Sequence, residues 1–453
     1  LLSDPPMVPG LGRKVLPFSC LAQLAVQIYA QTGDLEFLTE IFPHIQETCL
    51  AWFDPSLDRD QDGLPEWAVL AQTGWDDHPT FNIFNPEHLA TRIATTESFA
   101  LGKMLVEELD ALQKIARIVG DQVTLEHASA LQAKLTSQLE AMHTQFPEAS
   151  CWDRDSHQLT SQAVLFEGSI AELEHQSLHL AQAARINVKL LIGITAPKPT
   201  QVHILGESPN GKPIEETIPS AALSRLGEFL FFTTEQVYQQ IERISFPELS
   251  DQTWLRIYVA DLTLRDIGWY LAYTPEEKSE TPEHPEEATG EQSIGLSGSS
   301  PSEFSLYPSG LPNYEQKTQE AIKTGAVNPA WNSLVFEHLL EVGAKQEAAE
   351  LFASLMRGAV QVLRKEHHLC EAYNSQDALP LGKSNCLTGL LPLQIFLELA
   401  GIKLSTPDRV QVAGEYPFPW RLSIRYRGLE VVREGKNTIV TLPDGSVHHH
   451  FGS

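Results

Sequence analysis

The stretch LPFSCLAQLAVQIYAQTGDLEFLTEIFPHI, residues 16–45, predicts two helices that follow each other directly. Its first half carries apolar residues at the helical period, which is typical of an amphipathic helix. These residues are Leu21, Leu24, Ala25 and Ile28. Gly33 ends the first helix, because glycine adopts the left-handed backbone of a helix C-terminus without strain. Asp34 follows at once and is a favoured N-cap for the second helix. The fold therefore begins as a helical hairpin.

The helical pattern recurs on both sides of a long central segment. Residues 95–121 return to the helical period as far as Gly120, and another helix is expected from about Gln122 to His143. Helices come back at about Trp331, with the amphipathic AKQEAAELFASLMRGAVQVLRKE and the almost wholly apolar NCLTGLLPLQIFLELAGI. Helices on both sides of a different pattern are most simply one α domain that an insert interrupts.

The insert has the pattern of a small β-sandwich. Between residues 160 and 263, short runs such as TQVHILGE and TWLRIYVADLT alternate with turn signals such as SPNGKP. Residues 274–303 are rich in Pro, Glu, Ser and Gly, which predicts a flexible acidic loop. We expect a helical domain in two parts, residues 1–159 and 264–412, and a C-terminal β hairpin or tail over residues 413–453.

Composition and charge exclude several classes of function. The 453 residues carry a formal net charge of -27, which disfavours binding to nucleic acids and anionic membranes, because both attract basic surfaces. No apolar run approaches the roughly 20 residues of a transmembrane helix. The five cysteines are scattered and form no Cys-x-x-Cys pair, which predicts free thiols in a reducing, cytoplasmic setting. The oligomeric state is left open.

The loop after the first two helices contains DRDQDG, with Asp58, Asp60 and Asp62 at alternate positions before Gly63. Alternating oxygen ligands before a glycine bend are the front half of a calcium loop. A complete EF-hand has Glu at its twelfth position, where this chain has Val69. The EF-hand interpretation therefore fails. The three aspartates remain candidate calcium ligands, and the alternative is a solvated acidic turn.

The same loop continues into QTGWDDHP, which places Asp76 and Asp77 beside Trp75. A carboxyl group against an aromatic ring has its pKa raised by desolvation, as a general acid requires. Taken alone, the motif is equally a turn that exposes two acids to solvent.

Late in the chain, LCEAYNSQDALPLG predicts a polar loop that carries Glu371 and Tyr373, and NPAWNSLVF starts a helix with Trp331. Taken singly, these are an exposed acid at a helix end and a core tryptophan. Together with Asp76 they supply two carboxylates around an aromatic-lined pocket. That combination is what cleavage of a glycosidic bond needs.

In this order, the motifs resemble glycoside hydrolase family 63, which includes processing glucosidase I, bacterial α-glucosidases and mannosylglycerate hydrolase. The stretch over residues 16–45, then DRDQDGLPEW and TGWDDHP, then PAW and EAYN, carry the resemblance. It implies an (α/α)6 toroid, with Asp76 as the general acid and Glu371 as the general base. It also implies that the chain begins inside the toroid, and that the Asp-rich loop binds calcium as in some bacterial members.

The resemblance further implies which residues contact the sugar. They are Gln72, Trp75, Asp77, Trp331, Asn332 and Tyr373. One departure affects these contacts, since the family's usual Trp-Arg-Gly before Pro-x-Trp reads Ala326, Val327 and Asn328 here.

We therefore expect a mainly α protein, an N-terminally incomplete (α/α)6 toroid with an inserted β-sandwich and a β tail. The expected activity is that of an inverting, exo-acting α-glycosidase on α-glucosides or α-mannosides, with no cofactor beyond a structural calcium ion. A trehalase-like or glucan-debranching toroid hydrolase is the alternative enzyme. The non-enzymatic alternative is a carbohydrate-binding scaffold protein, stabilised by calcium and without catalysis.

Overall fold

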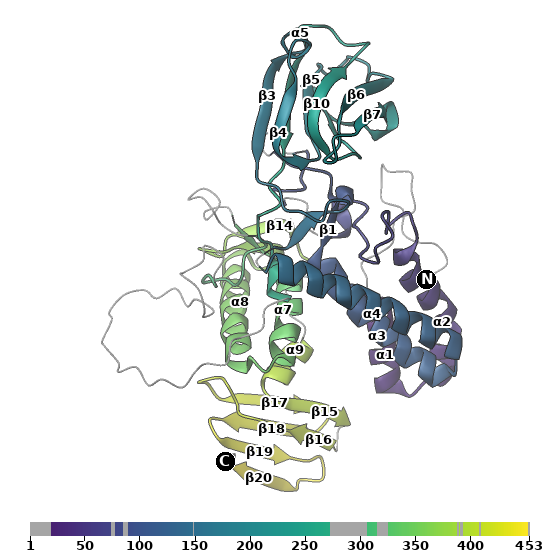
Figure 1. Cartoon of the computed structure of the whole chain (residues 1–453). Coiled ribbons are helices and arrows are strands. Elements are labelled where there is room, and N and C mark those ends of the chain that lie inside the picture. Colours follow the sequence, from purple (N-terminus) through teal and green to yellow (C-terminus); the bar gives the residue numbers. More distant parts are fainter. Residues whose placement is uncertain are drawn as a thin grey trace, which may run out of the picture. The chain divides into compact units, whose positions relative to one another are not determined.

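The structure is a computed structural model that describes residues 20–73, 78–84, 89–147, 149–271, 306–314, 325–386, 389, 393–406 and 409–451. The chain folds as two compact units, residues 1–264 and 265–453 (Figure 1). Helices hold 37% and strands 28% of the described residues. The expected mainly α composition is therefore not confirmed, because antiparallel sheets take up much of both units. The predicted acidic loop over residues 274–303 lies outside the described residues.

Two helical hairpins open unit 1 and match the predicted helices closely. They are α1 (Leu21–Thr32), α2 (Leu35–Leu50), α3 (Phe99–Val119) and α4 (Gln122–Gln145). Gly33 and Gly120 end α1 and α3 with φ of 67° and 82°, a backbone that side chains disfavour. The Asp34 carboxylate accepts the N–H of Phe37 at 2.9 Å and so caps α2. The predicted capping residues therefore act at their expected positions.

Helix α1 buries only part of the predicted apolar stripe. Ala25 of the stripe is 2% exposed and Ala22 is fully buried, whereas Leu24 and Ile28 are 50% and 37% exposed. A carboxylate fixes this orientation, because Glu108 of α3 accepts the N–H groups of Ala22 (2.8 Å) and Gln23 (3.2 Å). Amides at a helix N-terminus have no partner within the helix and attract negative charge. The capping contact therefore holds the first turn of α1 against α3.

Short elements connect the two hairpins and follow α4. They are η1 (Ala51–Phe53), η2 (Leu70–Gln72), η3 (Ile93–Thr95), β1 (Thr96–Ser98) and β2 (Cys151–Asp153). Strands β1 and β2 pair antiparallel, with Glu97 opposite Trp152. This pairing brings the start of α3 beside the segment that leads into the insert.

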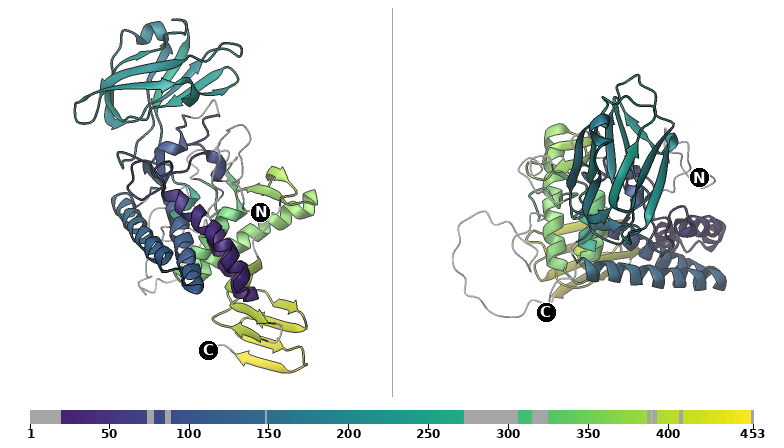
Figure 2. Two further views of the ribbon diagram at one scale, coloured as in Figure 1. Left: turned by 90° about the vertical axis from the view of Figure 1, so that its right-hand side faces the viewer. Right: turned by 45° about the horizontal axis from the view of Figure 1, so that its top comes forward.

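The insert is a β-sandwich, and Figure 2 shows its two sheets from two sides. One sheet has the order β4-β10-β6-β7 and the other β3-β11-β5-β9-β8. The strands are β3 (Ala163–Ser169), β4 (Leu178–Ala184), β5 (Asn187–Leu191), β6 (Gln201–Glu207), β7 (Pro213–Pro219), β8 (Ser224–Leu226), β9 (Phe229–Thr233), β10 (Tyr238–Ser245) and β11 (Trp254–Val259), with α5 (Ile170–Leu173) and η4 (Ser220–Ala222) between them. Buried residues such as Val188, Ile204 and Ile257 form its core.

In its described residues, unit 2 combines helices with three small antiparallel sheets. Its helices are η5 (Ile267–Leu271), α7 (Pro329–Glu341), α8 (Lys345–Glu366) and α9 (Leu393–Leu399). Its strands are β12 (Ala326–Val327), β13 (Cys370–Asn374), β14 (Pro380–Ser384), β15 (Ile402–Thr406), β16 (Arg409–Val412), β17 (Leu422–Tyr426), β18 (Leu429–Glu434), β19 (Asn437–Thr441) and β20 (Val447–Phe451). The last four strands form a meander in chain order. Across the described part of the chain, no helix has both the length and the apolarity to cross a membrane.

Candidate functional site

The acid-rich loop after α2 is held against α4 through its backbone. Lys134 of α4 donates from Nζ to the carbonyl oxygen of Gln61 at 2.8 Å. Gln138, one turn further along α4, donates to the carbonyl oxygen of Asp62 at 3.1 Å. Gly63 has φ 98°, and the Lys134 side chain occupies the space where a Cβ would lie. The glycine therefore lets the loop bend closely around the lysine, and α4 fixes the position of the aspartates.

A second part of the site is built by β1, β2 and the turn after β2. The Trp152 indole N–H donates to Oε2 of Glu97, its neighbour across the strand pair. Asp153 accepts both the N–H and the hydroxyl of Ser156 through Oδ1, at 3.0 Å each. The turn continues to His157, which has φ 49°. The imidazole stacks on Trp152, with ring centroids 4.7 Å apart and 7° between the planes.

The two parts meet in a cluster of three acids and one histidine. Asp60, Asp62, Glu97 and His157 each offer one donor atom, and these atoms lie within 4.8 Å of one another. Glu97 is fully buried, and among the described residues its Oε1 has no hydrogen-bond partner. Buried polar atoms are normally paired, and a buried charge needs a counter-charge. We therefore treat this cluster as a candidate cation site.

Burial and mutual repulsion shift the pKa values of the acids in this cluster. Desolvation raises the pKa of Glu97 to about 11, with the nearby Asp62 and Asp60 carboxylates adding to the rise. Desolvation also raises the pKa of Asp62 to about 6. Burial acts in the same direction on Asp60, but the hydrogen bond with His157 and a backbone hydrogen bond outweigh it, so its pKa is lowered. The cluster therefore resists holding three negative charges unless positive charge is supplied.

Only two of the three predicted metal ligands belong to this cluster. Asp58 lies outside it and is 5% exposed, and burial raises its pKa although backbone amides of Gly63 and Gln61 act in the opposite direction. Glu97 and His157 stand in no motif of the sequence that predicts a metal ligand. No local spacing links either residue to the DRDQDG loop, and the pairing of β1 with β2 is the one signal that would have joined them.

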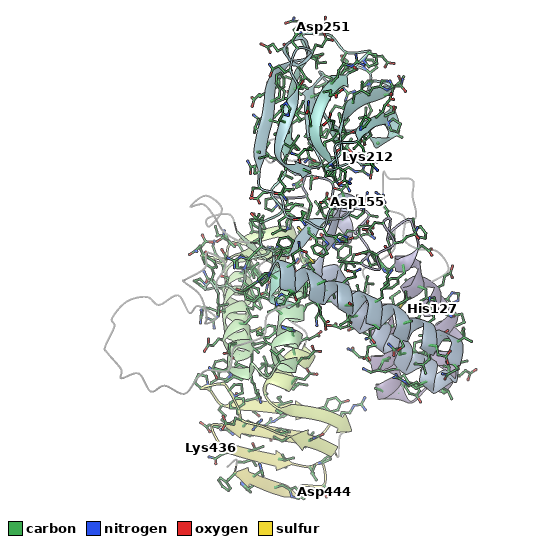
Figure 3. All side chains as sticks on the ribbon, in the orientation of Figure 1. His127, Asp155, Lys212, Asp251, Lys436 and Asp444 are labelled. Carbon is green, nitrogen blue, oxygen red and sulfur yellow. The ribbon has the colours of Figure 1, made fainter. Side chains whose placement is uncertain are left out.

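The β-sandwich holds the turn after β2 through a buried ion pair. Arg185 Nε lies 2.6 Å from Oδ2 of Asp153, and the two side chains are 4% and 5% exposed. Arg185 Nη1 donates to the backbone carbonyl oxygens of Thr234 and Glu235. Its Nη2 pairs with Asp155, which Figure 3 labels below the sandwich. The insert therefore contributes directly to the shape of the candidate cation site.

The expected general acid is not placed by the structure. Residues 74–77 lie outside the described residues. The predicted site residues in this segment are Trp75, Asp76 and Asp77. Gln72, just before it, is buried and accepts the N–H groups of Ala68 (2.7 Å) and Val69 (3.1 Å) through Oε1. The Gln72 side chain thereby closes the turn at η2.

The expected general base, Glu371, lies in unit 2 on strand β13 rather than in the predicted polar loop. It is the one partly exposed residue of β13, whose other four residues are buried. Glu371 Oε2 accepts the N–H of Lys383 at 3.1 Å. Gly382 has φ 71°, and a Cβ there would stand 2.7 Å from the same oxygen. Glycine therefore leaves the room that this carboxylate occupies.

The other predicted sugar contacts in unit 2 lie in its interior. Tyr373 is fully buried, and its hydroxyl donates to the carbonyl oxygen of Gly389 at 2.6 Å. Desolvation raises the pKa of Tyr373 to about 12. Trp331 is 4% exposed in the first turn of α7. Asn332 accepts the N–H of Leu311 and donates to its carbonyl oxygen, both at 3.1 Å. Tyr373 and Asn332 therefore hold backbone segments of unit 2 in place through buried hydrogen bonds.

Two of the solved structures that resemble this chain are of a GH63 mannosylglycerate hydrolase. The alignment with the enzyme from Thermus thermophilus in complex with glucose covers 85% of this chain and 75% of the enzyme, with 11% sequence identity and a TM-score of 0.44. The alignment with the structure of this hydrolase in complex with Tris covers 85% of this chain and 76% of the hydrolase, with 10% sequence identity and a TM-score of 0.43. No protein-family model and no curated protein matches the sequence.

Proposed function

We propose that the chain is a glycoside hydrolase that cleaves α-glucosides or α-mannosides with inversion, one terminal sugar at a time. In this proposal Asp76 is the general acid and Glu371 the general base. The proposed scaffold is an (α/α)6 toroid, as the resemblance of the sequence motifs implies. The order of the sequence motifs along the chain supports this assignment. Among the described residues, DRDQDG follows α2, PAW begins α7 and EAYN lies on β13.

The position of Glu371 is the observation that carries the proposal. A general base has to be reached by a water molecule and has to be held in one orientation. The Lys383 N–H holds one carboxylate oxygen of Glu371, and Gly382 leaves space beside it. The side chain is partly exposed, and buried Tyr373 lies two residues further along the same strand. This arrangement suits a carboxylate that acts on water at a protein surface.

The proposed reaction moves two protons. Asp76 gives its proton to the glycosidic oxygen as the bond between that oxygen and the anomeric carbon breaks. Glu371 takes a proton from a water molecule whose oxygen bonds to the anomeric carbon from the opposite face. Inverting enzymes leave room for that water by separating the two carboxyl groups by roughly 6.5–9.5 Å. Trp75 is proposed to stack on the apolar face of the sugar ring.

The anomeric form of the first product tests the stereochemistry. Hydrolysis of an α-linked substrate is expected to release the β-anomer first, because water enters opposite to the leaving oxygen. Proton NMR recorded within minutes, before mutarotation, distinguishes the two anomers. First release of the α-anomer would show a retaining mechanism and would remove the base role from Glu371.

The substrate is to be found by a product-release screen over nitrophenyl α-glucoside, nitrophenyl α-mannoside, glucosylglycerate and α-linked disaccharides. Mannosylglycerate belongs in the same screen, because the structural neighbours are named for its hydrolysis. Release of a free sugar from at least one of these compounds is expected. Binding of these sugars without release from any of them would instead favour the carbohydrate-binding scaffold.

A further inference from the structure

The donor set of the candidate cation site does not fit calcium. Calcium takes roughly six to eight oxygen ligands, whereas one of the four donors here is an imidazole nitrogen. Imidazole together with carboxylates is a ligand set of divalent first-row transition metals. We propose that Asp60, Asp62, Glu97 and His157 bind one such ion, of the class of Zn²⁺ or Mn²⁺, as a structural centre of unit 1.

The spacing of the donors agrees with a central ion. Nε2 of His157 lies 3.4 Å from Oδ2 of Asp60, 3.6 Å from Oδ2 of Asp62 and 3.8 Å from Oε2 of Glu97. In a tetrahedral zinc site with metal–ligand distances of about 2.0–2.2 Å, neighbouring donor atoms stand about 3.3–3.6 Å apart. The three observed distances are close to this edge length and to one another. Small side-chain movements would bring all four donors to one ion.

A protonated His157 would satisfy the cluster less completely than a metal ion. Its Nε2 carries a single N–H, and a hydrogen bond is directional and serves mainly one acceptor. Asp60 is the nearest acceptor. In the described part of the chain, Oδ2 of Asp62 and Oε1 of Glu97 have no hydrogen-bond partner. An ion at the centre would contact every member of the cluster at once.

The surroundings of the cluster orient two of the proposed ligands. The indole N–H of Trp152 donates to Glu97, and the indole ring stacks on the imidazole of His157. Groups that contact metal ligands in this way fix their orientation and tune their basicity. The ion would join the acid-rich loop to β1 and to the turn after β2. This inference concerns the stability of unit 1 and does not depend on the proposed hydrolase activity.

The test is a thermal unfolding series on the full chain after exhaustive dialysis against a strong chelator. Addition of Zn²⁺ or Mn²⁺ at about 100 times its dissociation constant is expected to raise the Tm by about 5 °C, because the ion binds only the folded state. Calcium or Mg²⁺ at the same concentration is expected to raise it by less than about 1 °C on the same scale. A shift with calcium as large as that with Zn²⁺, or no shift with any ion, would overturn the proposal.

Two variants locate the binding site. His157→Gln is expected to lose the response to Zn²⁺, whereas His127→Gln, an exposed histidine on α4 that Figure 3 labels, is expected to keep it. Both variants retain the exposed histidines 448–450, so any metal bound there contributes equally. Titration of each variant with Mn²⁺ gives the number of bound ions, because bound Mn²⁺ no longer contributes to the EPR signal of the free ion. The titration is carried out at a temperature where circular dichroism shows that both variants are folded. An unchanged Mn²⁺ stoichiometry in His157→Gln would also overturn the proposal.

Discussion

Glu371→Gln is expected to lower the kcat of the chain on its α-linked substrate by at least about 100-fold, the usual scale of a general acid–base contribution. The amide has nearly the shape of the carboxylate and still accepts the Lys383 N–H, but it does not take a proton from water. Asp76→Asn is expected to cause a loss of the same order, because the amide has no acidic proton to give to the leaving oxygen. Initial rates over a range of substrate concentrations give kcat and KM separately.

Two matched substitutions serve as controls for these variants. Glu341→Gln changes an exposed glutamate at the end of α7, and Asp251→Asn changes an exposed aspartate at the far end of the sandwich, labelled in Figure 3. Both are expected to keep the wild-type kcat, and circular dichroism checks that all four variants are folded. A kcat near that of the wild type in Glu371→Gln, with the substitution verified by mass spectrometry, would exclude Glu371 as the base.

Arg185→Met is expected to destabilise unit 1 by about 3–5 kcal/mol, the usual cost of removing one partner from a buried ion pair. The substitution leaves the Asp153 carboxylate buried without its 2.6 Å partner. It also removes the donor to the backbone carbonyl oxygens of Thr234 and Glu235. Urea denaturation followed by tryptophan fluorescence is expected to show a lower midpoint, since Trp152 lies directly before Asp153 in the chain.

An arginine-to-methionine substitution at an exposed ion pair distinguishes the stability cost of burial from that of losing a charge. Arg256 pairs with Glu167 at 2.9 Å, but the two side chains are 27% and 44% exposed. Arg256→Met is therefore expected to cost at most about 1 kcal/mol, as exposed ion pairs do. Asp153→Asn combined with Arg185→Met is expected to restore part of the loss, because no buried charge then remains unpaired. Equal losses for Arg185→Met and Arg256→Met would show that burial of the pair is not the cause.

Local signals in the sequence were sufficient for the helices of unit 1 but not for every strand of the insert. Gly33, Asp34 and Gly120 are capping residues whose effect depends on neighbours within one helical turn, so the helix ends were predictable. Strand β10 buries Tyr238, Ile241 and Ile244, a spacing of three residues that suggests a helix. The spacing arises because β10 changes register along both of its neighbours. Such a β-bulge adds a residue and breaks the two-residue period.

The same distinction applies to the candidate cation site. Asp60 and Asp62 stand in one short motif, so the sequence identified them directly. Glu97 and His157 reach the cluster through the pairing of β1 with β2 and through the turn that follows it. Arg185, which stabilises that turn, comes from the insert. These contacts depend on tertiary structure, and the spacing of residues within a short motif does not predict them.

The pairing of the first and last strands of the sandwich has a consequence for chain entropy. Ala163 of β3 lies opposite Val259 of β11, and beyond them the N–H of Leu262 donates to the carbonyl oxygen of Thr160 at 2.8 Å. The two ends of the folded insert are therefore as close together as if only a few residues, rather than about a hundred, joined them. This lowers the entropic cost of bringing the flanking segments together by about 3 kcal/mol. A sandwich that folds early thus makes every later contact between the preceding and the following residues less costly to form.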